Sequence, residues 1–260
     1  MNNYVDGGEA VLEAFRSLSV DYVMASPGSE WGAVWEALTR QKLNNTPGPI
    51  YFSCAHETLA VDLAIGYTVI TGKMQAVMLH TGVGLLQGSM GIDGANRLGI
   101  PMVIMSGEAL TYGEKQGFNP GAQWQAGLSV VGGPHRLAEP IVKWSTQASS
   151  TDTLYQQIVS AGELAQRMPA GPTFLCVPIE TQLNEWHPPE ELRVAPPRSR
   201  PHPPASEIEI LTGLLLNSQN PAIVTENAGR EVEGYTALVE LAELFGIPVI
   251  DGSQATYANF

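Results

Sequence analysis

Apolar and polar positions follow two different periods along this chain, and the two alternate from the first residues onward. Residues 8–18 place apolar side chains at the spacing of an amphipathic helix. Residues 75–79 and 101–106 are instead short runs of almost uninterrupted apolar residues, which are typical of strands buried on both faces. A regular alternation of such helices and strands predicts a mostly parallel sheet covered by helices on both faces.

The pattern predicts eleven elements before the first proline-rich stretch. We expect strands at residues 21–25, 50–54, 75–79, 101–106, 141–144 and 173–177. We expect helices at residues 8–18, 30–40, 57–71, 84–98 and 151–167. A long loop rich in glycine and aromatic residues separates the fourth and fifth strands, and a loop of that length in a compact domain is usually functional or disordered.

These elements predict an α/β fold for residues 1–185, with a doubly wound, mostly parallel, six-stranded sheet and helices on both faces. Residues 186–204 are rich in proline and read as a linker. Residues 205–260 begin a second α/β domain with two expected strands. Because two strands do not complete a doubly wound domain, we expect this part to be truncated or completed from elsewhere.

The composition of the 260 residues is that of a globular protein, with 44% hydrophobic and 15% charged residues. The formal net charge of −13 argues against nucleic acid as a partner. We find no polybasic patch for a lipid surface, no apolar run long enough to span a bilayer and no signal peptide. We therefore expect a cytoplasmic protein without a membrane partner, and two reduced cysteines.

Three polar residues at strand ends are candidates for chemistry, and each also has a purely structural interpretation. Glu57 falls at the start of an expected helix, where a carboxylate is often only a favourable partner of the helix dipole. His80 ends the third expected strand, where it could be bonded to backbone. Ser29 precedes the second expected helix and could be its N-cap.

Six segments in order change this balance, because together they resemble the pyrimidine-binding domain of thiamine-diphosphate-dependent enzymes. The resemblance is to the superfamily of acetolactate synthase, pyruvate oxidase and benzoylformate decarboxylase. The segments are Ser26-Pro27-Gly28-Ser29, His56-Glu57 with the following Gly66-Tyr67 and Thr71-Gly72-Lys73, His80-Thr81-Gly82-Val83-Gly84, residues 100–108, residues 140–145 and residues 171–178.

The resemblance implies that thiamine diphosphate is the cofactor and that Glu57 is catalytic. In the family a glutamate at this place hydrogen-bonds N1′ of the aminopyrimidine ring and thereby activates the cofactor. The turns after the first and third strands are implied to bind the cofactor through Pro27, Gly28, Thr81 and Gly82.

The resemblance also implies a set of substrate-contacting residues. Ser29 and His80 match a serine and a catalytic histidine of benzoylformate decarboxylase, in which they serve a 2-oxo acid. Gln123 and Trp124 fall near a segment of the family that lines the substrate channel, although packing is the simpler role for Trp124. Acetolactate synthases carry glycines near Ser29 and a Gly-Pro-Gly turn near His80, so this chain departs from them there.

The cofactor's diphosphate and its Mg²⁺ are held, in the family, by a C-terminal domain with a Gly-Asp-Gly motif that this chain lacks. We therefore expect no metal ligands here, and a chain that is inactive alone. The diphosphate-binding domain would come from a missing C-terminal part or another chain. A homodimer or homotetramer is implied, with an interface that includes the helices after Glu57 and Gly84. The resemblance leaves open whether the central domain binds FAD, because residues 226–230 depart from the family's turn.

The favoured function is an acetolactate-synthase-like lyase or carboligase that acts on a 2-oxo acid or a related ketone. The first alternative is a decarboxylase resembling benzoylformate decarboxylase, which would use Ser29 and His80. The second alternative is a non-catalytic subunit or fragment of such an enzyme. Glu57 argues against the second alternative, because a purely structural carboxylate need not lie in that sequence context.

Overall fold

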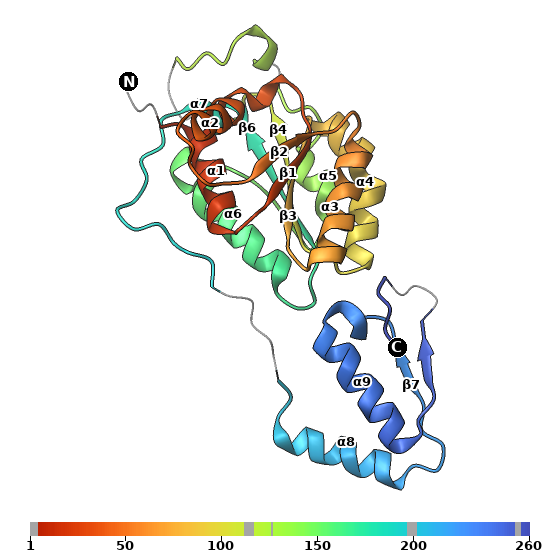
Figure 1. The fold of residues 1–260 in the computed structure, drawn as a ribbon. Coiled ribbons are helices and arrows are strands. Elements are labelled where there is room, and N and C mark those ends of the chain that lie inside the picture. The colour runs from red at the N-terminus through yellow and green to blue at the C-terminus, as the bar shows by residue number, and fades with distance from the viewer. Residues whose placement is uncertain (1–4, 112–116, 126, 197–201, 253–255) are drawn as a thin grey trace. The chain divides into compact units, whose positions relative to one another are not determined.

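The structure is a computed structural model that describes residues 5–111, 117–125, 127–196, 202–252 and 256–260. The chain divides into two compact units, Met1–Arg198 and Ser199–Phe260, and Figure 1 labels most of their helices and strands. The first unit contains a six-stranded sheet, and the second contains a two-stranded sheet.

The six strands of the first unit lie in the order β2-β1-β3-β4-β6-β5, and every neighbouring pair is parallel. They are β1 (Tyr22–Ser26), β2 (Ile50–Ser53), β3 (Gln75–Leu79), β4 (Met102–Glu108), β5 (Trp144–Gln147) and β6 (Pro172–Pro178). The predicted α/β fold with six mostly parallel strands is therefore confirmed. All six carboxyl ends meet at one edge of the sheet, because the strands run in the same direction.

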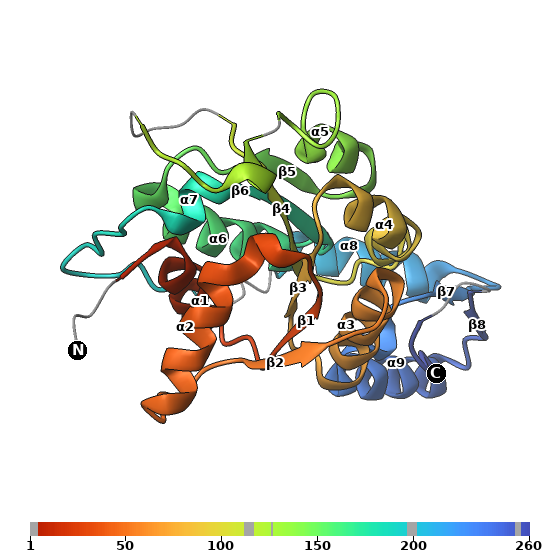
Figure 2. The same cartoon turned by 90° about the horizontal axis from the view of Figure 1, so that it is seen from above.

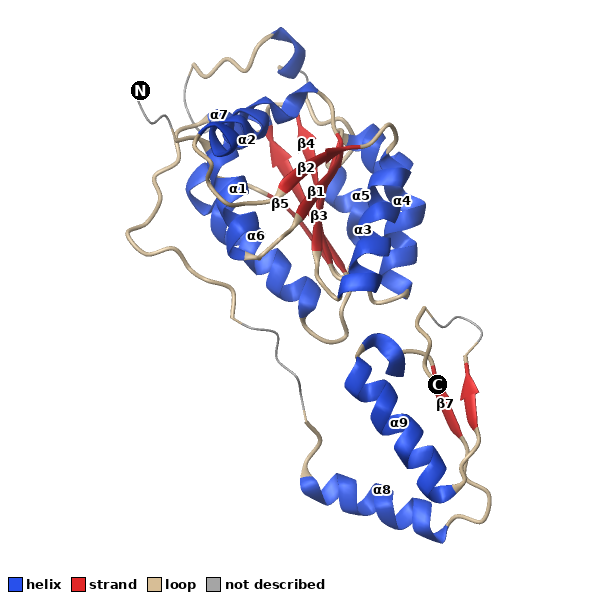
Figure 3. Cartoon of the chain, viewed as in Figure 1, coloured by secondary structure: helices blue, strands red, loops and turns tan. Residues whose placement is uncertain are grey.

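Helices cover both faces of this sheet, as Figures 1, 2 and 3 show. The α-helices are α1 (Gly7–Ser17), α2 (Gly32–Leu43), α3 (Glu57–Thr71), α4 (Gly82–Arg97), α5 (Pro134–Ala138), α6 (Thr151–Gln166) and α7 (Ile179–Leu183). Short 3-10 helices lie at η1 (Ser29–Trp31), η2 (Ala122–Trp124) and η3 (Glu139–Ile141). Helices α1 and α6 pack together on one face, and α3 and α4 pack together on the other.

Alternate strand residues feed two separate hydrophobic clusters, one on each face. Val23, Ala25 and Met78 belong to the cluster beneath α1 and α6. Met24 and Val77 belong to the cluster beneath α3 and α4. Because both faces are covered, a strand such as β3 must be apolar at every position, which is the continuous apolar pattern that the sequence shows.

One predicted strand is wrong in position, and the reason is a proline. A strand was expected at residues 141–144, but η3 occupies Glu139–Ile141 and β5 begins only at Trp144. Pro140 sits in the first turn of η3, where its fixed φ suits a helical turn and its missing N–H costs nothing. Lys143 then donates from Nζ to the carbonyl oxygens of Leu164 (2.6 Å) and Arg167 at the end of α6, and burial lowers the pKa of its ammonium group.

The second unit contains two helices and two parallel strands in its described part. Its elements are α8 (Ala205–Asn217), β7 (Ile223–Thr225), η4 (Ala228–Arg230), α9 (Val232–Phe245) and β8 (Val249–Asp251). Helix α9 ends at Gly246 in the left-handed conformation that glycine accepts at no steric cost. Throughout the described residues of both units, no helix is long and apolar enough to cross a membrane.

Candidate functional site

The candidate site lies at the carboxyl edge of the sheet, where the order of the strands reverses. Strand β1 lies between β2 and β3, so the connections from β1 and β3 leave the sheet in opposite directions. In open parallel sheets this reversal opens a crevice outside the carboxyl ends, and ligands bind there. The turn Pro27-Gly28 follows β1 and His80-Thr81 follows β3. A hydrogen bond of 3.1 Å from the His80 N–H to the Ser26 carbonyl joins the two turns.

Glu57 is the first residue of α3, and the preceding residue fixes where that helix starts. His56 has extended backbone and caps the helix, because its Nδ1 accepts a hydrogen bond from the Thr58 N–H at 3.1 Å. The Thr58 hydroxyl donates to the Gln87 carbonyl of α4 at 2.9 Å, so the starts of the two helices are tied together. Glu57 is half-buried. Within the described residues we find no hydrogen bond to its carboxylate.

Gly84, in the first turn of α4, brings Glu57 and His80 to the same place. A Cβ added at Gly84 would lie 2.9 Å from Cβ of His80 and 3.3 Å from Oε1 of Glu57. The bare backbone of Gly84 therefore separates the two side chains. Two of the residues predicted from the sequence, far apart along the chain, thus flank one surface of α4.

Ser29 and Gln123 are also brought together. Gln123 lies in η2, and its Nε2 is 3.5 Å from Oγ of Ser29, at the long limit for a hydrogen bond. Ser29 is exposed and begins η1, whose N-cap is Gly28, so it does not make the capping bond considered for it. Trp124 contributes its carbonyl oxygen, which accepts from the Leu110 N–H at 2.8 Å.

A buried carboxylate that the sequence analysis did not single out contacts His80. Both carboxylate oxygens of Glu30 lie 2.9 Å from Nδ1 of His80. The Glu30 side chain has no exposed surface, whereas 35% of the His80 side chain is exposed. Burying a charged group without a partner costs free energy. The contact with His80 therefore gives the buried Glu30 carboxylate a hydrogen-bond partner.

Two further buried carboxylates fix the ends of the long loop between β4 and β5. Oε1 of Glu108 accepts from the Ser129 N–H at 3.0 Å, and its Oε2 accepts from the Ser129 hydroxyl at 2.7 Å. That hydroxyl in turn accepts from the Gly82 N–H at 3.1 Å. Glu180 accepts from the N–H and the hydroxyl of Thr111, at 2.9 and 2.6 Å.

These carboxylates also affect the nearby thiol of Cys176. Burial, together with the charges of Glu108 and Glu180, raises the pKa of Cys176 well above its usual value. The thiol therefore stays protonated at neutral pH and acts as an apolar core group.

The remaining predicted residues occupy the turns expected for them. Pro27 and Gly28 lie directly after β1, Thr81 is buried and forms the N-cap position of α4, and Gly82 begins that helix. A Cβ added at Gly82 would overlap Cγ2 of Val130, so glycine is needed where the loop passes over α4. In the described part of the chain, no cluster of three or more His, Cys, Asp or Glu side chains could hold a metal ion.

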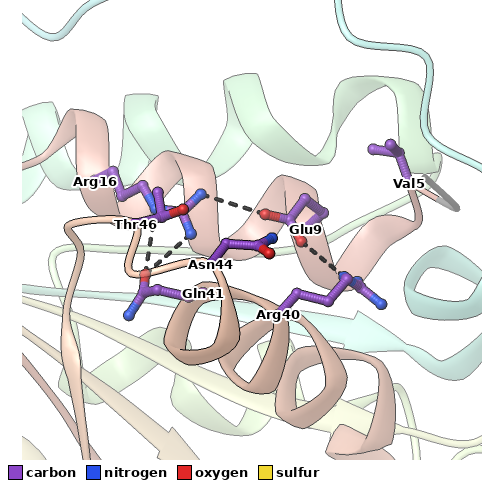
Figure 4. Close-up of a pocket in the computed structure, with 7 residues that line it drawn as sticks. All are labelled: Val5, Glu9, Arg16, Arg40, Gln41, Asn44 and Thr46. Carbon is purple, nitrogen blue, oxygen red and sulfur yellow. Dashed lines mark hydrogen bonds and ion pairs between the residues drawn. The ribbon is translucent and has the colours of Figure 1, made fainter. Parts of the chain in front are cut away.

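A pocket of about 230 Å³ lies elsewhere, between α1 and α2 (Figure 4). It is lined by Val5, Glu9, Arg16, Arg40, Gln41, Asn44 and Thr46, none of which belongs to the predicted site. Its two guanidinium groups are already paired with carboxylates, including Glu9 at 3.3 Å from Arg16 and 3.2 Å from Arg40. The pocket therefore offers no uncompensated charge to a ligand.

Comparison with known proteins identifies the fold and its family. The family described as "Thiamine pyrophosphate enzyme, N-terminal TPP binding domain" matches residues 5–127. The acetolactate synthase large subunit of Haemophilus influenzae is 25% identical over 94% of this chain and 41% of its own length. The acetolactate synthase of Bacillus subtilis is 23% identical over 96% of this chain and 41% of its own. These matches support a thiamine-diphosphate-dependent enzyme of the superfamily that includes acetolactate synthase, with residues 5–127 matching its N-terminal domain.

Solved structures of two members of this superfamily share the fold. Benzoylformate decarboxylase from Polynucleobacter necessarius superposes with a TM-score of 0.79 at 22% identity, over 98% of this chain and 45% of that one. A thiamine diphosphate-dependent 4-hydroxybenzoylformate decarboxylase of Rhodococcus jostii gives 0.78 at 20% identity, over 95% and 44%. The chain thus spans less than half the length of the relatives it matches.

The carboxylate of Glu57 is the group at the carboxyl edge that suits a nitrogen of an aminopyrimidine ring. Gly84 has no side chain at the point where the carboxylate of Glu57 approaches α4. The carboxylate of Glu57 faces this bare backbone. A half-buried carboxylate without a hydrogen-bond partner among the described residues is available for a ring nitrogen.

Proposed function

We propose that this chain supplies the aminopyrimidine-binding half of an active site, in an acetolactate-synthase-like lyase or carboligase that acts on a 2-oxo acid or a related ketone. The observation that carries the proposal is the carboxylate of Glu57, which lies against Gly84 at the carboxyl edge of the sheet. When bound, thiamine diphosphate supplies the nucleophilic carbon and the electron sink. Glu57 shares a proton with N1′ of the aminopyrimidine ring and holds the ring in place.

The same proposal divides the chain into domains and places the diphosphate-binding part of the active site outside this chain. Residues 1–185 form the pyrimidine-binding domain, residues 186–204 the linker and residues 205–260 the first part of the central domain. The diphosphate and Mg²⁺ are held by a domain outside this chain. The relatives that are more than twice as long support this division. We propose no flavin for the central domain, because residues 226–230 depart from the glycine-rich turn that the family has there.

A decarboxylase acting on an aromatic or aliphatic 2-oxo acid is the second candidate. Ser29 and His80 lie on neighbouring turns, and Ser29 contacts Gln123. In this version Ser29 and Gln123 bind the substrate carboxylate through hydrogen bonds, and His80 exchanges a proton with the carbonyl oxygen of the substrate. Both solved structures compared above are of decarboxylases, one of benzoylformate and one of 4-hydroxybenzoylformate.

Product analysis separates the two candidates. The holoenzyme that contains this chain is given labelled pyruvate together with an acceptor aldehyde or a second 2-oxo acid. A carboligase joins the two substrates and releases one CO₂ for each carbon–carbon bond formed, whereas a decarboxylase releases CO₂ and a free aldehyde. We expect the ligated product. Free aldehyde as the sole labelled product would favour the decarboxylase, and no turnover of either kind would favour the non-catalytic subunit.

We also propose a dimer or tetramer in which α3 and α4 form the interface. The two helices pack on each other and expose apolar side chains on their outer surfaces. These are Leu59, Leu63 and Ile70 on α3 and Val83, Leu86 and Met90 on α4. A set of this size on one pair of helices is unusual for a surface that faces water.

Met90→Glu is expected to weaken this assembly strongly. Met90 is 80% exposed, and burial of such a side chain contributes about 1.5–3 kcal/mol, so its replacement by a charge raises the dissociation constant at least about tenfold. Sedimentation velocity over a concentration series measures the shift. Leu43→Glu, at the end of α2 with 76% exposure, is the matched control and leaves the assembly intact. A wild-type holoenzyme that is monomeric would contradict the proposed interface.

A further inference from the structure

Glu30 and His80 form a side-chain pair at the carboxyl edge of the sheet. Glu30 lies in η1, after β1, and His80 lies directly after β3. Nδ1 of His80 lies 2.9 Å from each oxygen of the Glu30 carboxylate. An ionised carboxylate can only accept hydrogen bonds, so Nδ1 of His80 is the nitrogen that carries the hydrogen when it faces one. The carboxylate is fully buried, and Nδ1 of His80 is the side-chain atom that satisfies it as a hydrogen-bond acceptor.

Two glycines form the slot that holds this pair. A Cβ added at Gly28 would overlap both Nδ1 of His80 and Oε2 of Glu30. A Cβ added at Gly107, in strand β4, would overlap Cγ of Glu30. Any side chain at either position would displace the carboxylate or the imidazole. The glycines therefore serve the Glu30–His80 contact itself rather than an unusual backbone conformation.

The backbones on both sides of the pair are fixed as well. The indole Nε1 of Trp31, next to Glu30, donates to the carbonyl oxygen of Leu79, next to His80, at 2.9 Å. The His80 N–H donates to the Ser26 carbonyl at 3.1 Å. Trp31 is fully buried. The side-chain contact is thus set within a frame of hydrogen bonds that holds β3 and η1 in a fixed relation.

We propose that Glu30 is the positioning residue of His80: it keeps the proton on Nδ1 and leaves Nε2 as the nitrogen that exchanges a proton with the substrate. The inference rests on the decarboxylase candidate of the proposed function, in which His80 serves the substrate carbonyl. A neutral imidazole donates from one nitrogen and accepts at the other. A carboxylate that accepts from one nitrogen therefore determines what the other can do, as in hydrolases whose histidine is oriented by an aspartate.

The decisive measurement is the tautomer of His80 in the full chain, which needs no loaded enzyme. The protein is labelled with ¹⁵N-histidine, and the resonance of His80 among the five histidines is assigned by its loss in His80→Gln. We expect the wild type to carry the proton on Nδ1, seen in the two-bond couplings of the ring. A wild-type ring with its proton on Nε2 alone would overturn the proposal without any Glu30 variant.

Glu30→Gln is the matching variant, since its amide can either accept from Nδ1 or donate to it. We expect the Nδ1-protonated form to lose population in favour of the Nε2-protonated form. Glu180→Gln removes the charge of another buried glutamate, one that contacts Thr111, and leaves the His80 spectrum unchanged. An unchanged His80 tautomer in Glu30→Gln, with the fold verified by circular dichroism, would refute the positioning role.

Kinetics of the holoenzyme separates this inference from the proposed function. Glu30→Gln is expected to lower kcat for the 2-oxo acid at least about tenfold, part of the ~10²–10⁴-fold that general acid–base assistance supplies, while hydrogen exchange at C2 of the cofactor keeps its wild-type rate. In a His80→Gln background Glu30→Gln has no further effect on kcat. An additive effect would refute the inference alone. Exchange that does not depend on Glu57 would refute the proposed function and leave the tautomer result standing.

Discussion

Replacement of Glu57 by glutamine is expected to slow hydrogen–deuterium exchange at the thiazolium C2 by about 10²–10⁴-fold. Glutamine keeps the shape of the side chain and its reach to N1′. It cannot hold the proton that the ring nitrogen must share, so the step that depends on that proton is lost. Glu57 is half-buried at the start of α3, against Gly84, and we expect glutamine to keep this position.

A purely structural role predicts a different result. A carboxylate in the first turn of a helix contributes about 0.3–1 kcal/mol through the helix dipole, and glutamine there would hardly change catalysis. Exchange is measured by NMR on the holoenzyme with the cofactor saturating. Glu36→Gln, which removes a carboxylate from α2 with 74% of its side chain exposed, is the control. Equal exchange rates in the wild type and Glu57→Gln would make Glu57 a helix-terminal carboxylate only.

Trp31→Ala is expected to lower the free energy of unfolding by about 3–5 kcal/mol. Trp31 is fully buried in the cluster beneath α1 and α6. Its loss removes a large apolar contact and also leaves the Leu79 carbonyl without its partner. Urea unfolding followed by circular dichroism gives the midpoint and slope, and a changed midpoint at constant slope reports stability.

Two variants divide this effect into its parts. Trp31→Phe retains most of the packing, so its smaller loss reports the hydrogen bond, which is worth about 0.5–1.5 kcal/mol, together with the smaller ring. Trp35→Ala is the control, because Trp35 is 36% exposed and donates only to the Tyr51 hydroxyl at 3.2 Å. If Trp31→Ala and Trp35→Ala lowered the free energy of unfolding equally, the backbone hydrogen bonds around Glu30 and His80 would not depend on Trp31.

The sheet could be predicted from the sequence because its physical cause is simple. A strand covered by helices on both faces must be apolar at each position, and β3 and β4 are buried from end to end. The two short helices α5 and α7 were not predicted, because five residues each are too few to establish a helical period. The shift of β5 past residue 141 depends on Pro140 and its 3-10 turn, which the apolar pattern does not reveal.

The candidate site was predictable in part. Glu57, His80 and Ser29 stand at strand ends inside recognisable motifs, whereas the partner of His80 was missed. Glu30 resembles an ordinary charge at the start of a helix, and only the fold shows that it points inward and is fully buried. One signal was available: Glu30, Glu108 and Glu180 each follow an apolar strand or its turn, and parallel strands place such residues at one edge.

The two anchors of the loop between β4 and β5 have a consequence for how such a protein diversifies. Glu180 holds the loop at Thr111 and Glu108 holds it at Ser129, so both ends are tied to the carboxyl edge of the sheet. The intervening segment can change in length at little cost, since doubling a flexible loop adds only about 0.6 kcal/mol of closure entropy. Gln123 belongs to that segment, whereas Glu57 and His80 do not. Under the proposed decarboxylase function, in which Gln123 binds the substrate, substrate preference can therefore change through insertions and deletions in this loop.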